Sequence, residues 1–149
     1  MSDDYYTPKS AWDNIQHFIP KDKVIWEAFY GDGNSGDFLK ELGFDVIHKN
    51  IDFFKNDLGD IIVSNPPFSK KKEIFKRLLE LDKPFILILP ISVITYNYYR
   101  NLDLQNKIQY IVPKSRIHFK KTGLNKSSCN FDCLYYCYKM NLPKDIIFL

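Results

Sequence analysis

The sequence has little cysteine, no long apolar run and only a small excess of positive charge, and each shortage excludes a class of protein. Its three cysteines, at positions 129, 133 and 137, are too few for a disulfide framework and lack the partner ligands of a zinc site. We therefore expect buried thiols and no metal. The longest apolar run, 84–94, is broken by Pro90 and is shorter than the roughly 20 residues that cross a bilayer.

Charge and length set further limits. Lys and Arg exceed Asp and Glu by 21 to 18, which tolerates a polyanionic partner without the strong basic excess of a nucleic-acid coat protein. The acidic start, Met1-Ser2-Asp3-Asp4, lacks the basic and apolar parts of a targeting segment. With 149 residues, 45% of them hydrophobic, the chain can close one core but not two. We expect a single domain over residues 1–149, intracellular and soluble, without a membrane partner.

Strand-like and helix-like segments alternate along the first two thirds of the chain. Near-continuous apolar strands between amphipathic helices are typical of a parallel sheet covered on both faces. The interval from Gly43 to Asp60 leaves little room for a helix, and the C-terminal strands are expected to pair as an antiparallel hairpin. The sequence thus predicts an α/β fold with a doubly wound, mostly parallel, seven-stranded sheet. Predicted strands are 24–26, 46–47, 61–63, 85–89, 108–112 and 131–138, and predicted helices begin at Ser10, near Phe38 and near Ile74.

A glycine-rich turn, Gly31-Asp32-Gly33-Asn34-Ser35-Gly36, follows the first predicted strand and opens a helix. In that context backbone amides can approach a cofactor and the helix N-terminus faces it, although similar glycines also serve ordinary tight turns. A dinucleotide site also needs an acidic residue after the next strand, to hold the ribose hydroxyls. That strand ends in His48-Lys49-Asn50, which argues against a nicotinamide cofactor.

The tetrapeptide Asn65-Pro66-Pro67-Phe68 directly follows a predicted strand, at the edge where open α/β sheets bind ligands. Two prolines fix the backbone, so the Asn65 side-chain oxygen and a neighbouring carbonyl can act as rigid acceptors for an amino group with two hydrogens. Acceptors on both hydrogens stabilise the positive charge that develops when adenine N6 attacks a methyl carbon. Phe68 offers a face for a base swung out of the stack.

These residues resemble the class I N6-adenine methyltransferases, whose catalytic motif is Asp, Asn or Ser followed by Pro-Pro and an aromatic residue. The resemblance implies S-adenosylmethionine as cofactor and Asn65, Pro66, Pro67 and Phe68 as the catalytic motif. The family's ribose-binding acid is absent, and Asn50 is the nearest candidate for its place. By resemblance the cofactor-binding residues are Tyr6, Thr7, Pro8, Glu27, Phe29, Gly31, Gly33, Asn50, Asp52 and Phe53.

The resemblance implies methyl transfer to adenine N6 of a nucleic acid, with DNA favoured as partner. Alternatives are an RNA adenine, a protein glutamine, or an inactive subunit that retains the fold. The chain has no residues left for a separate target-recognition domain, so we expect specificity to be low, borne by loops or supplied by a protein partner.

Two basic segments are candidates for substrate contact. Lysines at 70–72 follow the tetrapeptide, and a second group lies between residues 114 and 126 with His118 and Phe119 interleaved. Such charge can pair with phosphates, although a solvated surface explains it equally well. The tyrosines at 96, 98, 99, 135, 136 and 138 are expected to be strand and surface packing residues rather than a platform on which bases stack. The predicted substrate-binding residues are Lys70, Lys71, Arg116, His118, Phe119 and Lys120.

Overall fold

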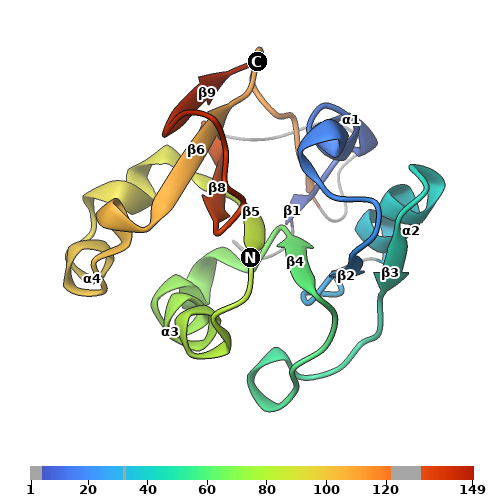
Figure 1. Ribbon diagram of the computed structural model, residues 1–149, viewed down its shortest axis with the longest axis horizontal. Coiled ribbons are helices and arrows are strands. Elements are labelled where there is room, and N and C mark those ends of the chain that lie inside the picture. Colours follow the sequence, from blue (N-terminus) through green and yellow to red (C-terminus); the bar gives the residue numbers. More distant parts are fainter. Residues whose placement is uncertain (1–4, 32, 122–131) are drawn as a thin grey trace.

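The computed structural model describes residues 5–31, 33–121 and 132–149, without the side chains of Tyr5, Phe68, Lys120 and Lys121. Its main element is a seven-stranded sheet with the order β3-β2-β4-β5-β8-β6-β9 (Figure 1). β2 to β5 are parallel, whereas β8 lies between β5 and β6 and is antiparallel to both. The strands are β2 (Val24–Trp26), β3 (Asp45–Ile47), β4 (Ile61–Ser64), β5 (Phe85–Pro90), β6 (Ile108–Val112), β8 (Cys133–Tyr138) and β9 (Ile146–Phe148).

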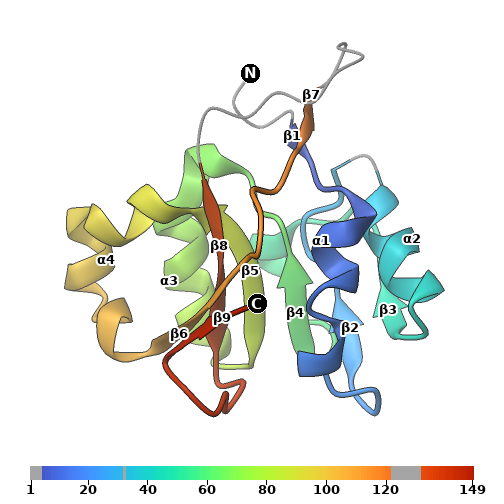
Figure 2. The same ribbon diagram turned by 90° about the horizontal axis from the view of Figure 1, so that it is seen from above.

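Helices cover both faces of this sheet (Figures 1 and 2). α1 (Lys9–Asp13) and α2 (Asn34–Glu41) lie on one face, and α3 (Lys71–Leu81) and α4 (Asn97–Asn101) lie on the other. The predicted doubly wound, mostly parallel sheet with an antiparallel C-terminal part is therefore confirmed. Short 3-10 helices fill the connections: η1 (Gln16–Phe18), η2 (Phe53–Lys55), η3 (Phe68–Lys70), η4 (Ile91–Thr95) and η5 (Leu104–Asn106).

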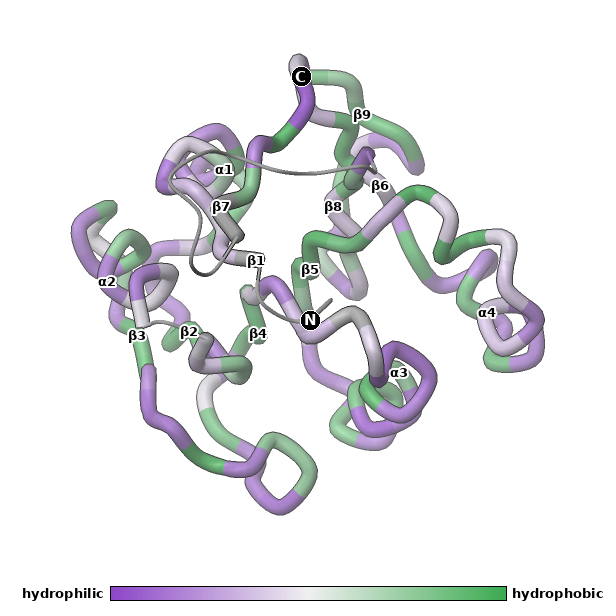
Figure 3. Tube along the Cα trace, turned by 180° about the vertical axis from the view of Figure 1, so that it is seen from behind, coloured by the Kyte–Doolittle hydropathy of each residue, from purple (hydrophilic) through white to green (hydrophobic). Residues whose placement is uncertain are grey.

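β5 is apolar along its whole length, and β4 is apolar up to Ser64, because alternate side chains enter two separate cores. In β4, Ile61 and Val63 pack with α1 and α2, whereas Ile62 packs with α3. β5 divides in the same way, and Figure 3 colours both strands as hydrophobic. Cys133 and Cys137 on β8 are buried, as predicted for the thiols at these two positions. Cys129 lies outside the described residues.

The N-terminal helix differs from the prediction. Ser10 does not cap it but lies inside α1, and the helix starts after Pro8, whose carbonyl accepts a hydrogen bond from the Ala11 N–H at 3.1 Å. A fixed φ near −65° suits proline to this boundary, which explains the shift of the helix start. α1 ends at Asp13, and η1 takes the chain to Phe18.

Three of the strands that the structure describes have no counterpart in the prediction, and neither has the helix α4. β9 adds a parallel edge strand beside β6, and β1 (Tyr5–Tyr6) pairs antiparallel with β7 (Lys120–Lys121) to form a small separate ribbon. Figure 2 shows this ribbon beyond the carboxyl ends of the parallel strands. Between β3 and β4 the structure has only η2, as expected from the short interval. Within the described residues, no helix is both long and apolar enough to cross a bilayer.

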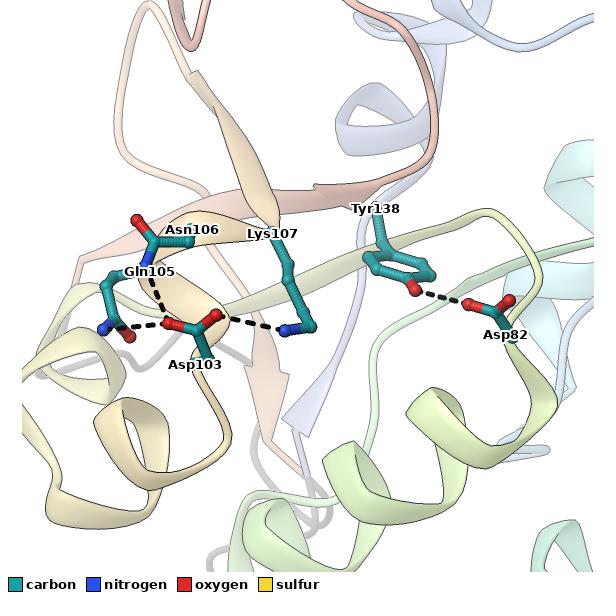
Figure 4. A network of polar contacts seen from close by, with 6 residues as sticks. All are labelled: Asp82, Asp103, Gln105, Asn106, Lys107 and Tyr138. Carbon is teal, nitrogen blue, oxygen red and sulfur yellow. Dashed lines mark hydrogen bonds and ion pairs between the residues drawn. The ribbon is translucent and has the colours of Figure 1, made fainter.

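Two turns that lie away from that end of the sheet are stabilised by hydrogen bonds to exposed aspartates (Figure 4). Asp82, which follows α3 with φ 54°, accepts a 2.5 Å hydrogen bond from the Tyr138 hydroxyl and pairs with Lys139 at 2.8 Å. The hydrogen bonds from Lys139 and Tyr138 lower the pKa of Asp82, while burial and Asp82 raise the pKa of Tyr138 to about 12. Asp103 accepts similar bonds from Asn106 and Lys107.

Candidate active site

A buried carboxyl group joins the ends of two neighbouring parallel strands. Glu27 follows β2 and is only 1% exposed, and its Oε1 accepts hydrogen bonds from the Phe29 N–H at 2.9 Å and the Ser64 hydroxyl at 2.5 Å. Ser64 is the last residue of β4 and immediately precedes the tetrapeptide. Glu27 therefore couples the position of the glycine-rich turn to that of Asn65.

A cavity of about 460 Å³ opens at this end of the sheet. Three segments line it: residues 28–31 after β2, residues 50–54 after β3, and a segment that runs from Pro67 into the first turn of α3 and includes Ile74. Its volume lies in the range of small-molecule and cofactor sites. Of the predicted cofactor residues, Phe29, Gly31, Asn50, Asp52 and Phe53 line this cavity.

Aromatic rings and an ordered turn shape one side of the cavity. The rings of Phe29 and Phe53 lie 4.7 Å apart, and Phe53 also contacts the ring of Trp26 at 5.7 Å. Asp52 starts η2, and its Oδ1 accepts a 2.8 Å hydrogen bond from the Phe54 N–H. This cap holds the acidic side chain and the Phe53 ring in a fixed relation at the cavity wall.

The remaining predicted cofactor residues occupy different places. A Cβ placed on Gly31 would lie 3.9 Å from the Tyr6 ring, so Tyr6 covers the glycine-rich turn. Thr7 is buried, and its hydroxyl has no hydrogen-bond partner within the described part of the chain. Pro8 caps α1. Gly33, with φ 88°, is not among the residues that line the cavity but faces the Tyr30 ring.

His48 is a structural residue that the sequence analysis did not single out. Its ring stacks on Tyr30 with centroids 4.5 Å apart and fills the space beside Gly36, where an added Cβ would lie 2.0 Å from Nδ1. Gly36 is the third glycine of the turn, and such a glycine signals close packing between helix and strand. That signal could have identified the residue after β3 as its partner.

The side-chain oxygen of Asn65 is a hydrogen-bond acceptor that receives no hydrogen bond from the described residues. It directly follows β4 and is half-buried, and its Oδ1 is buried with no hydrogen-bond partner among the residues that the structure describes. Pro66 is buried and Pro67 lines the cavity. The backbone of Phe68 begins η3, and its side chain lies outside what the structure describes.

The predicted substrate residues lie in different parts of the structure. Lys70 lines the cavity, and the Lys71 ammonium lies 5.5 Å from the centre of the Tyr96 ring. Arg116 pairs with Asp132 at 2.8 Å. His118 is exposed, and the backbone of Lys120 pairs with Tyr6 in the small ribbon.

Phe119 requires a correction. It alternates with the exposed His118, and its ring is fully buried in the core beneath α1. It therefore presents no surface to a nucleic acid, and the expectation of substrate contact for this ring is wrong. Ile117 enters the same core, so the segment follows the two-residue period of an extended chain.

Comparison with known proteins places this arrangement in a family. The family described as adenine-specific methyltransferase EcoRI matches residues 34–128, more than half of the chain. The chain belongs to this family. It is also 36% identical over 87 residues to the type II methyltransferase M.EcoRI of Escherichia coli, a match that covers 58% of the chain. The chain spans about a quarter of that relative's length, 23%.

Solved structures share the fold of this chain. A dimethyladenosine transferase from Plasmodium falciparum superposes with a TM-score of 0.53 at 13% identity, over 89% of this chain and 62% of the other. A Listeria monocytogenes protein described as a class I S-adenosylmethionine-dependent methyltransferase gives a TM-score of 0.57 at 13% identity, over 99% and 66%. The fold is therefore that of S-adenosylmethionine-dependent methyltransferases.

Proposed function

We propose that this chain binds S-adenosylmethionine and transfers its methyl group to the exocyclic N6 of adenine in a nucleic acid, with DNA favoured. The observation that carries the proposal is the unpartnered, buried Oδ1 of Asn65 at the carboxyl end of β4, next to a segment that lines the cavity. Family membership supports it, because the E. coli relative is named a type II methyltransferase and the family is described as adenine-specific.

The cavity residues fit an adenosine-containing cofactor. Asp52 offers an acidic acceptor for an adenine amino group, Phe29 and Phe53 offer apolar faces, and Asn50 offers a neutral partner for the ribose. Gly31 lets the backbone pass close to the ligand at φ 59°. Once bound, S-adenosylmethionine supplies an electrophilic methyl group on its sulfonium.

The tetrapeptide would act on the nucleophile. An unpartnered buried acceptor costs about 1–3 kcal/mol, so a donor from the substrate amino group stabilises Asn65 as well as the substrate. As N6 attacks the methyl carbon, nitrogen becomes positive, and acceptors on both of its hydrogens stabilise that charge. Pro66 and Pro67 keep the acceptors in place before the substrate arrives. Phe68 is proposed as the platform for the base.

A side-by-side transfer assay tests the proposal. Purified chain is incubated with S-adenosylmethionine labelled in the methyl group and with DNA, RNA or a glutamine-containing protein, and labelled nucleosides and peptides are identified by mass spectrometry. We expect label in N6-methyladenine of DNA. Label only in RNA adenine or only in glutamine would overturn the DNA assignment.

Cofactor binding separates an enzyme from an inactive subunit. Calorimetry should show binding of S-adenosylmethionine to the wild type and to Asn101→Ala, a control at an exposed asparagine on α4. A chain that binds no S-adenosylmethionine would be the inactive subunit. Specificity borne by loops or supplied by a protein partner remains part of the proposal, and the methylation pattern on a random-sequence DNA pool measures it.

A further inference from the structure

An apolar ridge follows β5 at the same end of the sheet as Asn65. We define the ridge as residues 91–96, which comprise η4 and Tyr96. Ile91, Ile94 and Tyr96 are 42%, 37% and 41% exposed, although large apolar side chains near a sheet are more often covered. Tyr96 is a surface packing residue, as expected: its ring lies 5.6 Å from that of Tyr98, and the residue remains partly exposed.

The ridge is held firmly in place. Val93 is fully buried in the core with α3, and the Ile91 N–H donates to the Asp132 carbonyl at 2.9 Å. The Tyr96 N–H donates to the Val93 carbonyl at 3.3 Å. A rigid scaffold thus presents these apolar side chains, which lowers the entropic cost of binding a partner.

Positive charge lies on both sides of the ridge. On one side, the Lys71 ammonium lies 5.5 Å from the Tyr96 ring centre, and Lys72 is exposed on the same turn of α3. On the other side, Ile91 shares a depression of about 220 Å³ with Lys114 and Arg116. The nearby acids are Glu73 on α3 and Asp132, which is paired with Arg116.

The ridge also lies beside the candidate active site. β4 and β5 are parallel neighbours with Ser64 opposite Leu87, and β5 continues to Pro90, so the ridge begins beyond the level of Asn65 at the same end of the sheet. In Figure 2 the chain from β5 to α4 lies on the α3 side of the sheet. A polymer whose adenine reaches Asn65 would therefore continue across the ridge.

We propose that the ridge binds the nucleic-acid strand next to the target adenine, with Tyr96 stacking on an unpaired base and Lys71, Lys72 and Lys114 contacting phosphates. Alternating cations and an exposed aromatic ring match a polymer of alternating phosphates and bases. An apolar protein partner would not need cations on both sides. The position of the adenine rests on the proposed function, whereas the binding surface does not.

Binding to two strands of equal length tests the stacking. One labelled single-stranded DNA carries bases throughout, and the other is abasic, and affinity is measured by fluorescence anisotropy. Tyr96→Ala and Tyr96→Leu should weaken binding of the base-bearing strand roughly 5-fold to 150-fold, the effect of losing one stacked base. Both variants should leave binding of the abasic strand unchanged, and Tyr96→Phe, which retains the ring, should bind like wild type. Phe148→Ala, at a 77% exposed aromatic on the edge strand β9, is the matched control.

The phosphate contacts have a separate signature. Lys72→Gln should weaken binding of both strands equally and reduce the slope of log affinity against log salt by about 0.7, the value for one phosphate of a single strand. The proposal is overturned if Tyr96→Ala leaves the affinity for the base-bearing strand unchanged, or weakens both strands equally. Because this readout uses neither cofactor nor methyl transfer, an inactive chain that shows the Tyr96 effect would contradict the proposed function but not the ridge.

Discussion

Gly36→Ala tests how the glycine-rich turn is held against the sheet. An alanine in α2 would gain up to about 1 kcal/mol in helix propensity. However, its Cβ would lie 2.0 Å from Nδ1 and 2.2 Å from Cγ of His48. Rotation of the ring about the Cβ–Cγ bond leaves Cγ in place, and rotation about the Cα–Cβ bond would break the stack on Tyr30. Overpacking of this kind costs about 1–3 kcal/mol.

We therefore expect Gly36→Ala to destabilise the fold by about 1–2 kcal/mol, which lowers Tm by roughly 2–8 °C for a chain of this size. Urea unfolding followed by circular dichroism measures the change. In a His48→Ala background the same substitution should be neutral or stabilising, because the ring is gone. His48 also stacks on Tyr30 at the cavity wall, so both single variants should weaken S-adenosylmethionine binding.

The reasoning fails if Gly36→Ala stabilises the wild type, or if its effect is the same in both backgrounds. Two groups in contact should show an interaction free energy of at least about 0.5 kcal/mol in such a cycle.

Three further outcomes are expected. Asn50→Asp should tighten S-adenosylmethionine binding about 5-fold in calorimetry, because a carboxylate makes stronger hydrogen bonds to ribose hydroxyls than an amide does. Unchanged or weaker binding would show that this side chain does not face the ribose. The pKa of Asp82 in the folded protein lies below 3.8, so the stabilising contribution of this carboxylate is complete above pH 3.8 and is lost as the pH falls through the folded pKa. Asp82→Asn should therefore lose less stability than wild type on acidification. Equal losses of stability, measured by urea unfolding, would contradict this. Burial raises the pKa of Cys137 from 9.0 to about 12. In a Cys129→Ser background, the buried thiols of Cys133 and Cys137 should therefore react with a disulfide reagent only as fast as the chain unfolds. Rapid reaction of the native protein would refute their burial.

Apolar continuity made the sheet predictable. Runs such as 24–26 and 85–89 match strands because both faces of the sheet are covered, so no polar residue interrupts them. β9 escaped prediction because Ile146 and Phe148 lie on an exposed edge, where burial imposes no pattern. The β1–β7 ribbon consists of two residue pairs, and the paired residues are far apart in the sequence. The local sequence therefore contains no signal of that pairing.

The site was partly predictable for a similar reason. Residues close to strand ends, such as Asn65 and Gly31, are placed by the strands themselves. The role of His48 depends on the missing Cβ of Gly36, a contact between helix and strand that spacing alone does not reveal. Phe119 is buried although substrate contact was expected for it, because tertiary packing decides which aromatic rings are buried.

Single-turnover methyl transfer by Asn65→Ala tests the central claim most directly. The assay uses S-adenosylmethionine and an adenine-containing DNA oligonucleotide, with DNA binding measured separately and Asn101→Ala as control. If Asn65 stabilises charge that appears only as the bond between N6 and the methyl carbon forms, the rate should fall about 100-fold to 1000-fold with little change in DNA affinity. Full activity in Asn65→Ala would contradict the mechanism, even if the fold is correct and the cavity binds S-adenosylmethionine.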